Sequence, residues 1–419
     1  SCPVNRSKTT PNALFLAILA GLGMVGPFSI DTIFPAFGSL GAEWGVSEFA
    51  LQQLVSVYLL SFAAMSLLHG PLSDALGRRP VIIAGTILYT LVSIGCALSP
   101  NLTVLLVFRA LQGMTAGAGQ IVSRAMVRDV YSDDQAQRTM SHIAMIFGLA
   151  PALAPIVGGW ILGVGNWRDI FWFLAAFGLV LLVLVQFWMP ETHPSQDRTP
   201  FSVERLTGSL LQVWRNPSGR RLAFTGMFNF AGMFLYISSA PLFVVKLLGK
   251  GEQDFWILFV PLISGMVVGS WASGQLAGRI SGRRLATLGY VISAVGALTN
   301  LVLSLLPSTQ GLPWAVAALP VLSFGIAIAF PILTLAMLDL FPTLRGAASS
   351  VQSFVQLLAN AAIAGVLAPM LAFSLPSLAV GALVMVAIAW SLWQWHLHVT
   401  HQEPPTTHEA AAYEPTEDM

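Results

Sequence analysis

Long apolar runs separated by short polar turns dominate the chain, and this pattern predicts membrane-spanning helices. A helix that crosses a bilayer needs about 20 mostly apolar residues, because lipid offers no partner for backbone polar groups. The chain supplies such a run twelve times. The predicted spans are residues 13–37, 50–70, 80–98, 101–125, 140–163, 169–190, 222–245, 255–278, 285–306, 312–338, 348–372 and 376–398.

The longest polar stretch, Pro190 to Leu206, divides these spans into six and six. Its Pro, Ser, Thr and charged residues are typical of a linker between two bundles. The end of the chain after residue 400 is rich in Glu, Pro and Thr, a composition that favours disorder. The predicted organisation is an N-terminal tail (1–12), a six-helix bundle (13–190), a linker (191–221), a second six-helix bundle (222–398) and a disordered tail (399–419).

An internal repeat indicates that the two bundles are related. The segment GPLSDALGRR at 70–79 follows the second span, and GQLAGRISGRR at 274–284 follows the eighth. The second copy is one residue longer and has Gly278 where the first has Asp74. Duplicated six-helix halves are typical of secondary transporters, with the substrate site between the halves. We therefore predict an all-α integral membrane protein with twelve helices in two pseudo-symmetric six-helix bundles.

The composition supports a location in lipid and excludes several classes of protein. Hydrophobic residues make up 55 % of the 419 residues and charged residues only 9 %, whereas soluble domains carry about 25 % charged residues. A formal net charge of +1 gives no electrostatic footprint for nucleic acid. The chain has neither a phosphate-binding loop, nor a nucleophile elbow, nor a zinc-protease helix motif. We expect a protein that is not an enzyme, with no catalytic residues, no metal and no cofactor.

The distribution of basic residues predicts the orientation of the chain. On the twelve-span topology, 16 of the 20 Lys and Arg residues fall on one side, Arg124 and Arg128 among them. Basic residues concentrate on the cytoplasmic side of membrane proteins. Both termini are therefore predicted to lie in the cytoplasm, in a multi-pass protein of a bacterial inner membrane.

Two charged residues inside predicted spans are candidates for proton coupling. Asp31 and Arg109 lie at similar depths in the first and fourth spans, so they could share one cavity. Charges within the membrane are costly and are usually functional. Arginine stays protonated, so Arg109 can be a fixed positive partner while Asp31 is the predicted proton carrier. A static buried ion pair is the structural alternative.

Polar residues on the eleventh span are candidates for the substrate cavity. Gln352, Gln356 and Asn360 recur every four residues and so share one helix face, which could contact a ligand or hydrogen-bond to other helices. The remaining candidates for an amphipathic pocket are Tyr58, Met145, Asn229, Tyr236 and Phe330.

Three segments resemble motifs of the major facilitator superfamily. The loop at 70–80 is similar to its signature between the second and third helices, although Ala75 replaces the usual basic residue. Segment 109–119 resembles the fourth-helix motif with Arg109, Gln112 and Gly113 in place. Segment 148–160 resembles the fifth-helix motif of drug and proton antiporters, with Ala154 in place of the usual Gly. Its two prolines, together with SIDTIFP at 29–35, look like the bicyclomycin and chloramphenicol resistance group.

The resemblance implies a role for two of these motifs. The expected latch between access states comprises Gly70, Asp74, Gly77, Arg78 and Arg79. The expected antiporter helix motif, which would bend its helix and pack it closely against the opposite half, comprises Gly148, Pro151, Pro155, Gly158 and Gly159.

The predicted function is proton-coupled export of amphipathic drugs, such as phenicols or bicyclomycin, by alternating access. Its expected partners are the drug, protons and the lipid bilayer, with no nucleic acid, and the protein is expected to be a monomer. The alternative is a transporter of the same fold for a sugar, an amino acid or a siderophore.

Overall fold

A computed structural model describes residues 13–131, 133–251 and 253–402, and helices make up most of them. The N-terminal half contains α1 (Ala13–Asp31), η1 (Phe34–Ala36), α2 (Phe37–Trp44), α3 (Glu48–Leu76), α4 (Arg78–Ala97), α5 (Leu102–Val130), α6 (Asp133–Val164) and α7 (Trp167–Trp188). The connection between the halves contains η2 (Ser195–Asp197) and α8 (Val203–Arg215). The C-terminal half contains α9 (Pro217–Ser238), η3 (Leu242–Leu247), α10 (Trp256–Leu276), α11 (Gly282–Leu305), η4 (Pro307–Thr309), α12 (Trp314–Ala317), α13 (Leu319–Asp339), α14 (Arg345–Ala362), η5 (Ile363–Leu367), α15 (Ala368–Leu371) and α16 (Leu375–Gln402).

Eleven segments of the described chain are long and apolar enough to cross a membrane, in agreement with eleven of the twelve predicted spans. The seventh predicted span corresponds to α9, which is 22 residues long but carries Arg220, Arg221 and Asn229 and so is less apolar. It packs along α13, α14 and α16 like the other helices of its half. The chain is thus a multi-pass membrane protein in which α9 occupies the seventh place.

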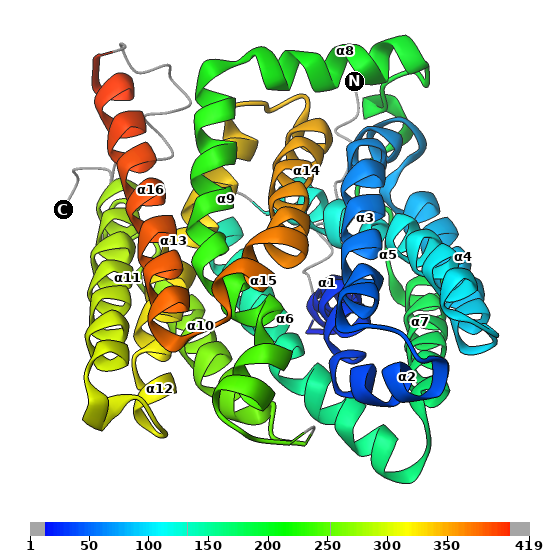
Figure 1. Cartoon of the computed structure of the whole chain (residues 1–419). Helices are drawn as coiled ribbons and strands as arrows, with labels where there is room; N and C mark the ends of the chain where they lie inside the picture. The colour runs from blue at the N-terminus through cyan, green and yellow to red at the C-terminus, as the bar shows by residue number, and fades with distance from the viewer. Residues whose placement is uncertain (1–12, 132, 252, 403–419) are drawn as a thin grey trace, which may run out of the picture.

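The two halves lie side by side and meet through two equivalent pairs of helices (Figure 1). One pair is α3 with α14, and the other is α6 with α10. In each pair the second span of one half packs against the fifth span of the other. This reciprocity is what a two-fold relation between duplicated halves requires, and it supports the relation that the repeated loops indicate.

The first predicted span is interrupted, and the linker contains an unpredicted helix. The α-helix ends at Asp31, because Pro35 lacks an amide hydrogen and disfavours helical geometry at the residue before it. The linker helix α8 begins after Ser202, whose hydroxyl accepts a hydrogen bond from the Arg205 amide, and it lies across one end of the bundle (Figure 1). We call this the α8 end and the opposite one the α2 end.

The structure also differs from two of the predicted segment boundaries, namely the start of the second bundle and the start of the C-terminal tail. Helix α9 begins at Pro217, within the predicted linker, and α16 continues to Gln402, four residues into the predicted tail. The predicted tail at 1–12 and residues 403–419 lie outside the described residues.

Candidate substrate cavity and coupling site

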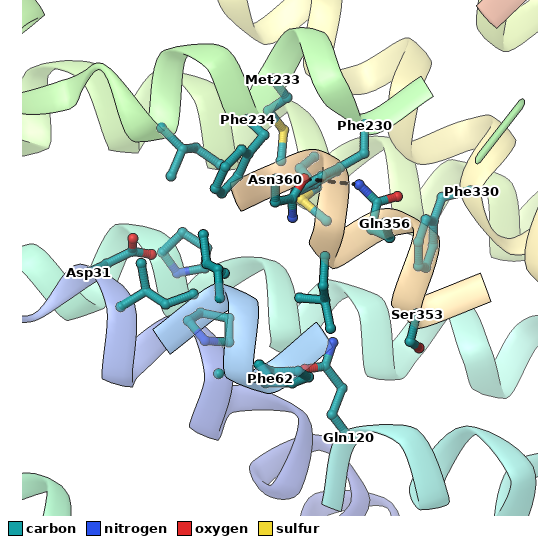
Figure 2. Close-up of a pocket in the computed structure, with 18 of the residues that line it drawn as sticks. Asp31, Phe62, Gln120, Phe230, Met233, Phe234, Phe330, Ser353, Gln356 and Asn360 are labelled. Atoms are coloured by element: carbon teal, nitrogen blue, oxygen red, sulfur yellow. Dashed lines mark hydrogen bonds between the residues drawn. The ribbon is translucent and has the colours of Figure 1, made fainter. Parts of the chain in front are cut away.

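A cavity of about 110 Å³ lies between the two halves, and both contribute to its walls (Figure 2). Its walls are mostly apolar with a few polar groups, which is the usual character of a site for an amphipathic small molecule. The lining residues are Gly26, Pro27, Ile30, Asp31, Leu59, Phe62, Gln120, Arg124, Pro151, Phe230, Met233, Phe234, Ile237, Met266, Phe330, Ser353, Gln356, Leu357 and Asn360.

Asp31 lines this cavity at the point where α1 ends. The residue is 2 % exposed, and its Oδ1 atom is buried without a hydrogen-bond partner among the described residues. Figure 2 places it at one end of the cavity. A buried carboxyl oxygen that accepts no hydrogen bond lacks the contacts that stabilise a fixed carboxylate, so this group is suited to taking up a proton.

Arg109 lies near Asp31 but does not form an ion pair with it. Its guanidinium donates hydrogen bonds to the carbonyl oxygens of Ser29 and Leu54, at 2.6 and 3.0 Å, and to Gln112 Oε1 at 2.9 Å. None of the four ion pairs found among the described residues includes either residue. The direct pairing expected from sequence is therefore corrected to an indirect one. Arg109 holds the backbone of α1 two residues before Asp31.

The other two residues of the fourth-helix motif fix the position of Arg109. Gln112 accepts from Arg109 and donates to Ser93 Oγ at 2.9 Å. A Cβ atom on Gly113 would lie 2.2 Å from the Tyr58 carbonyl oxygen, so only glycine allows α5 to approach α3 this closely. The Arg109 guanidinium in turn lies 4.7 Å from the centre of the Tyr58 ring. The motif thus builds a rigid support behind the cavity.

The polar stripe on α14 contacts the cavity in part. Gln356 and Asn360 line it, and Gln356 Nε2 donates a hydrogen bond to Asn360 Oδ1 at 3.1 Å (Figure 2). Gln352 does not line the cavity, because it lies a turn further toward the α8 end and packs near Gly226 of α9. Ser353, which the four-residue spacing omitted, takes its place in the wall.

Of the five other predicted cavity residues, Phe330 alone lines the cavity. Tyr58 is buried against Arg109. Asn229 donates to the Ile326 carbonyl oxygen, and the Tyr236 hydroxyl accepts from Asn300. Met145 is half-buried on α6, six residues and so about 240° around the helix from Pro151, which does line the cavity. These four assignments are corrected: Tyr58, Asn229 and Tyr236 point into helix contacts within the halves, and Met145 does not line the cavity.

Sequence analysis also missed several residues of the wall. Aromatic and methionine side chains, namely Phe62, Phe230, Met233, Phe234 and Met266, supply most of its apolar surface. Among so many apolar residues in apolar helices, no spacing marks these as facing a cavity. Arg124 is the other omission. It was assigned to the cytoplasmic surface at the end of the fourth span, but α5 continues to Val130 and places Arg124 in the cavity wall.

The predicted latch closes the α8 end of the interface. Arg78 forms ion pairs with Asp74 at 2.6 Å and with Asp129 at 2.9 Å, and all three side chains are largely buried. Arg128 reaches from α5 to Asp339 of α13 at 2.5 Å and so joins the halves directly. This arrangement provides Asp74 with a buried arginine partner.

Gly70 allows the two halves to touch through their backbones. A Cβ atom there would lie 2.1 Å from the Gly346 carbonyl oxygen of α14, and the Gly70 amide donates to Ser350 Oγ at 3.0 Å. A Cβ atom on Gly346 would lie 2.4 Å from a carboxyl oxygen of Asp74. Asp74 therefore lies over the first turn of α14, where the helix dipole favours a negative charge.

The remaining latch residues bind the start of the linker. Gly77 has a φ of 98° and ends α3. The Glu191 carboxylate then accepts hydrogen bonds from the amides of Arg78 and Arg79, at 2.9 Å each. The Arg79 side chain donates to the Gln186 carbonyl oxygen at 2.6 Å. The loop, the start of α4 and the linker thus form one connected unit.

The antiporter helix motif lies in α6 but contacts its own half more closely than expected. A Cβ atom on Gly158 would lie 2.2 Å from the Thr32 carbonyl oxygen, just after α1. The expected close approach of this glycine to the opposite half is therefore corrected. Pro151 lines the cavity, Pro155 and Gly159 line a groove that also includes Trp256 of the opposite half, and Gly148 lies in the same helix.

At the α2 end the halves enclose a wider groove of about 540 Å³. Residues of α2, α3 and both π-helical segments line it, including Gly38, Gln52, Leu242 and Gly365. One ion pair crosses it, from Glu48 to Lys246 at 2.8 Å, and both side chains are more than half exposed. Access to the interface is thus wider from the α2 end than from the α8 end.

Two helical halves around a central cavity, closed at one end and grooved at the other, are the arrangement of a secondary membrane transporter. The chain belongs to the Major Facilitator Superfamily, whose sequence pattern matches residues 14–364. This membership confirms the predicted class, a transporter and not an enzyme.

Two bacterial relatives and one solved structure are similar to this chain. The chain is 26 % identical to the Bicyclomycin resistance protein homolog of Haemophilus influenzae over 372 residues, covering 88 % of this chain and 91 % of the relative. It is 30 % identical to Multidrug resistance protein D of Escherichia coli over 365 residues, covering 85 % and 89 %. The crystal structure of the human organic anion transporter MFSD10 superposes with a TM-score of 0.74 at 19 % identity, over 92 % of this chain and all of that one, which shows the shared fold.

Proposed function

We propose that this protein is a proton-coupled drug exporter of a bacterial inner membrane. It would exchange protons that move inward for an amphipathic drug that moves outward, with no cofactor beyond the proton gradient. The names of its bacterial relatives support drug resistance as the function. The observation that carries proton coupling is the buried, incompletely hydrogen-bonded carboxyl group of Asp31 in the wall of the central cavity.

The position of Asp31 supports a simple cycle. Protonation removes the charge of Asp31 from a mostly apolar cavity and weakens its interaction with a bound drug. Loss of the proton restores a hydrogen-bond acceptor for the next drug molecule. Because Arg109 holds the backbone of α1 two residues away, a change of charge at Asp31 can act on the first helix directly. In this cycle Asp31 carries the proton and Arg109 holds Asp31 in position.

The orientation follows from the basic residues of the α8 end, which carries Arg79, Arg205 and Arg215 among others. By the positive-inside rule the α8 end faces the cytoplasm, with both termini on that side. The latch then closes the cytoplasmic end and the groove opens outward, which is the geometry of drug release. A monomer is the proposed functional unit, since one chain supplies both halves of the cavity.

The proposal is tested by substrate-evoked dissipation of a preformed pH gradient in inverted vesicles enriched in this protein. The panel comprises phenicols, bicyclomycin, lipophilic cations, sugars and amino acids, and vesicles from empty-vector cells give the background. We expect a drug to dissipate the gradient above background. A response to a sugar or amino acid alone would contradict the drug assignment, and movement of labelled drug without any proton movement would contradict coupling.

A further inference from the structure

Arg124 is a cationic residue in the cavity wall that has no acidic partner among the described residues. Its Nη1 atom lies 3.4 Å from Ser353 Oγ, and its guanidinium lies 5.8 Å from the centre of the Phe330 ring. None of the ion pairs among the described residues includes it. A guanidinium has five donors. One long hydrogen bond and a distant ring leave most of this capacity unused.

Two neighbouring arginines at the α8 end, Arg78 and Arg128, are paired. Arg128, one turn further along α5, binds Asp339, and Arg78 binds both Asp74 and Asp129. Their role in holding the closed α8 end accounts for their charge. Arg124, which is half-buried, contributes no such ion pair, although a charged group partly withdrawn from water is costly without a counter-charge. Its place in the wall is therefore better explained by a ligand than by the fold.

Asp31 is the other charged residue of the cavity wall, but it lies too far away to neutralise Arg124. In Figure 2 Asp31 is at one end of the cavity, whereas Phe330 and Ser353, the two residues that contact Arg124, are at the other. Along α5, Arg124 lies 15 residues, or about 22 Å, beyond Arg109, which supports the backbone near Asp31. The cavity thus has an acceptor end and a separate donor end.

The surroundings of Arg124 fit an anion attached to an apolar body. Its planar fork can bind a carboxylate or a sulfonate with two parallel hydrogen bonds. Ser353 and Gln356 on α14 and Gln120 on α5 add neutral polar groups to the wall. Phe330, Phe230 and Met233 offer apolar surface for the rest of the molecule.

We propose that Arg124 binds the anionic group of the transported molecule, so that the substrates include amphipathic carboxylates or sulfonates rather than lipophilic cations. This inference rests on the proposed function in one respect, namely that the central cavity is the site of transport. The inference adds the chemical class of the substrate to the proposed function.

The test compares two probes of the same shape that differ in charge, 1-naphthaleneacetate and 1-naphthaleneacetamide. Equilibrium dialysis measures binding of each to the full chain in lipid nanodiscs. Because one strong charge-assisted contact changes affinity by about tenfold, we expect the unmodified protein to bind the carboxylate about tenfold more tightly than the amide. Equal or tighter binding of the amide would overturn the inference, and this comparison requires no variant.

Variants locate the discrimination. Arg124→Gln should bind both probes with the affinity of the amide, and Arg124→Lys should keep part of the preference for the carboxylate. Arg284→Gln is the matched control, since Arg284 is exposed on α11 away from the cavity, and it should bind like the unmodified protein. An unchanged preference in Arg124→Gln, or an equal loss of both probes in a variant that elutes as a single species, would contradict recognition by Arg124.

The same nanodisc and vesicle preparations separate this inference from the proposed function. Proton movement evoked by a phenicol without any carboxylate preference would contradict the inference alone. A carboxylate preference that depends on Arg124, in a protein that moves no protons with any substrate, would contradict proton coupling alone.

Discussion

The two ends of the interface differ in how the halves are held together. At the α8 end, Arg78 bridges two buried carboxylates, Arg128 joins the halves, and Gly70 brings backbones into contact. At the α2 end, a groove of about 540 Å³ is crossed by one ion pair whose side chains are 56 % and 71 % exposed. Buried, hydrogen-bonded charges resist separation, whereas exposed pairs contribute little. The contrast indicates a state that is firmly closed at one end and easily rearranged at the other.

The repeated loops show a second asymmetry, which lies between the two halves rather than between the two ends. The first loop has Asp74, whose carboxylate binds Arg78 and lies against Gly346 of the opposite half. The second loop has Gly278 at the equivalent position, with a φ of 77°, and so has no carboxylate to offer there. A duplicated structure thus gains a one-sided latch through a single residue type.

The largest effect is expected from filling the backbone contact at Gly70. Gly70→Leu would place its side chain into the Gly346 carbonyl oxygen and so prevent closure of the α8 end. We expect drug export to be abolished, with a longer distance between spin labels on the α8 ends of α3 and α14. Gly208→Leu is the control, because nothing lies within 4 Å of a Cβ atom at that position. Normal export by Gly70→Leu would show that this contact is dispensable.

The next largest effect is expected at Arg78. Arg78→Gln leaves Asp74 and Asp129 buried without their cation, and breaking a buried pair in this way costs about 3–5 kcal/mol. Unfolding in detergent micelles with increasing dodecyl sulfate would measure the loss in the free energy of unfolding. Arg284→Gln is the control, because Arg284 lies in the second repeated loop and is exposed. Its free energy of unfolding should fall by less than about 0.5 kcal/mol. Similar losses in the two variants would contradict the buried latch.

A smaller effect is expected at the pair between Arg128 and Asp339. Arg128→Gln removes one hydrogen bond between charged groups, worth about 1.5–3 kcal/mol. The same unfolding measurement should register this loss. Exchange of the two charges, Arg128→Asp with Asp339→Arg, should restore part of it. The single variants of this cycle are Arg128→Asp and Asp339→Arg. A double variant that loses more stability than the two single variants lose together would argue against a direct pair.

The smallest effect is expected at the α2 end. Glu48→Gln breaks an exposed pair with Lys246, and such pairs contribute about 0–1 kcal/mol. Stability should change within this range, and the change should vanish in high salt because exposed charges are screened. A loss as large as that of Arg78→Gln would show that both ends are locked and would remove the contrast.

The sequence alone was sufficient for the architecture but not for the details of the helices. Apolar runs of bilayer length predicted twelve spans, because lipid requires them whatever the tertiary structure. The amphipathic helix α8 was missed since its apolar residues, such as Leu206 and Leu210, alternate with polar ones in a segment interpreted as a linker. The break after Asp31 depends on Pro35, whose effect on a long apolar run was not anticipated.

The candidate site was predictable in part, most directly where charge made a residue conspicuous. Asp31 stands out because a carboxyl group inside an apolar helix is rare, and the cavity does include it. Arg124 was missed because a basic residue near the end of a span was assigned to the surface. Among neutral residues, Gln356 and Asn360 line the cavity whereas Tyr236 and Asn229 satisfy their polar groups inside the C-terminal half. Whether a neutral polar residue lines the cavity depends on the rotation of its helix and on the hydrogen-bond partners within reach. Both depend on packing between segments that are distant in the sequence.

Asp31→Asn tests proton coupling through the cavity most directly. Asparagine has the size of aspartate but has no carboxyl group that can take up and release a proton. In proteoliposomes we predict that Asp31→Asn loses drug transport driven by a pH gradient yet keeps exchange of labelled for unlabelled drug, while Asp197→Asn, on the exposed linker, keeps both. Uphill transport by Asp31→Asn at the rate of the unmodified protein would contradict the assignment of Asp31 as the proton carrier.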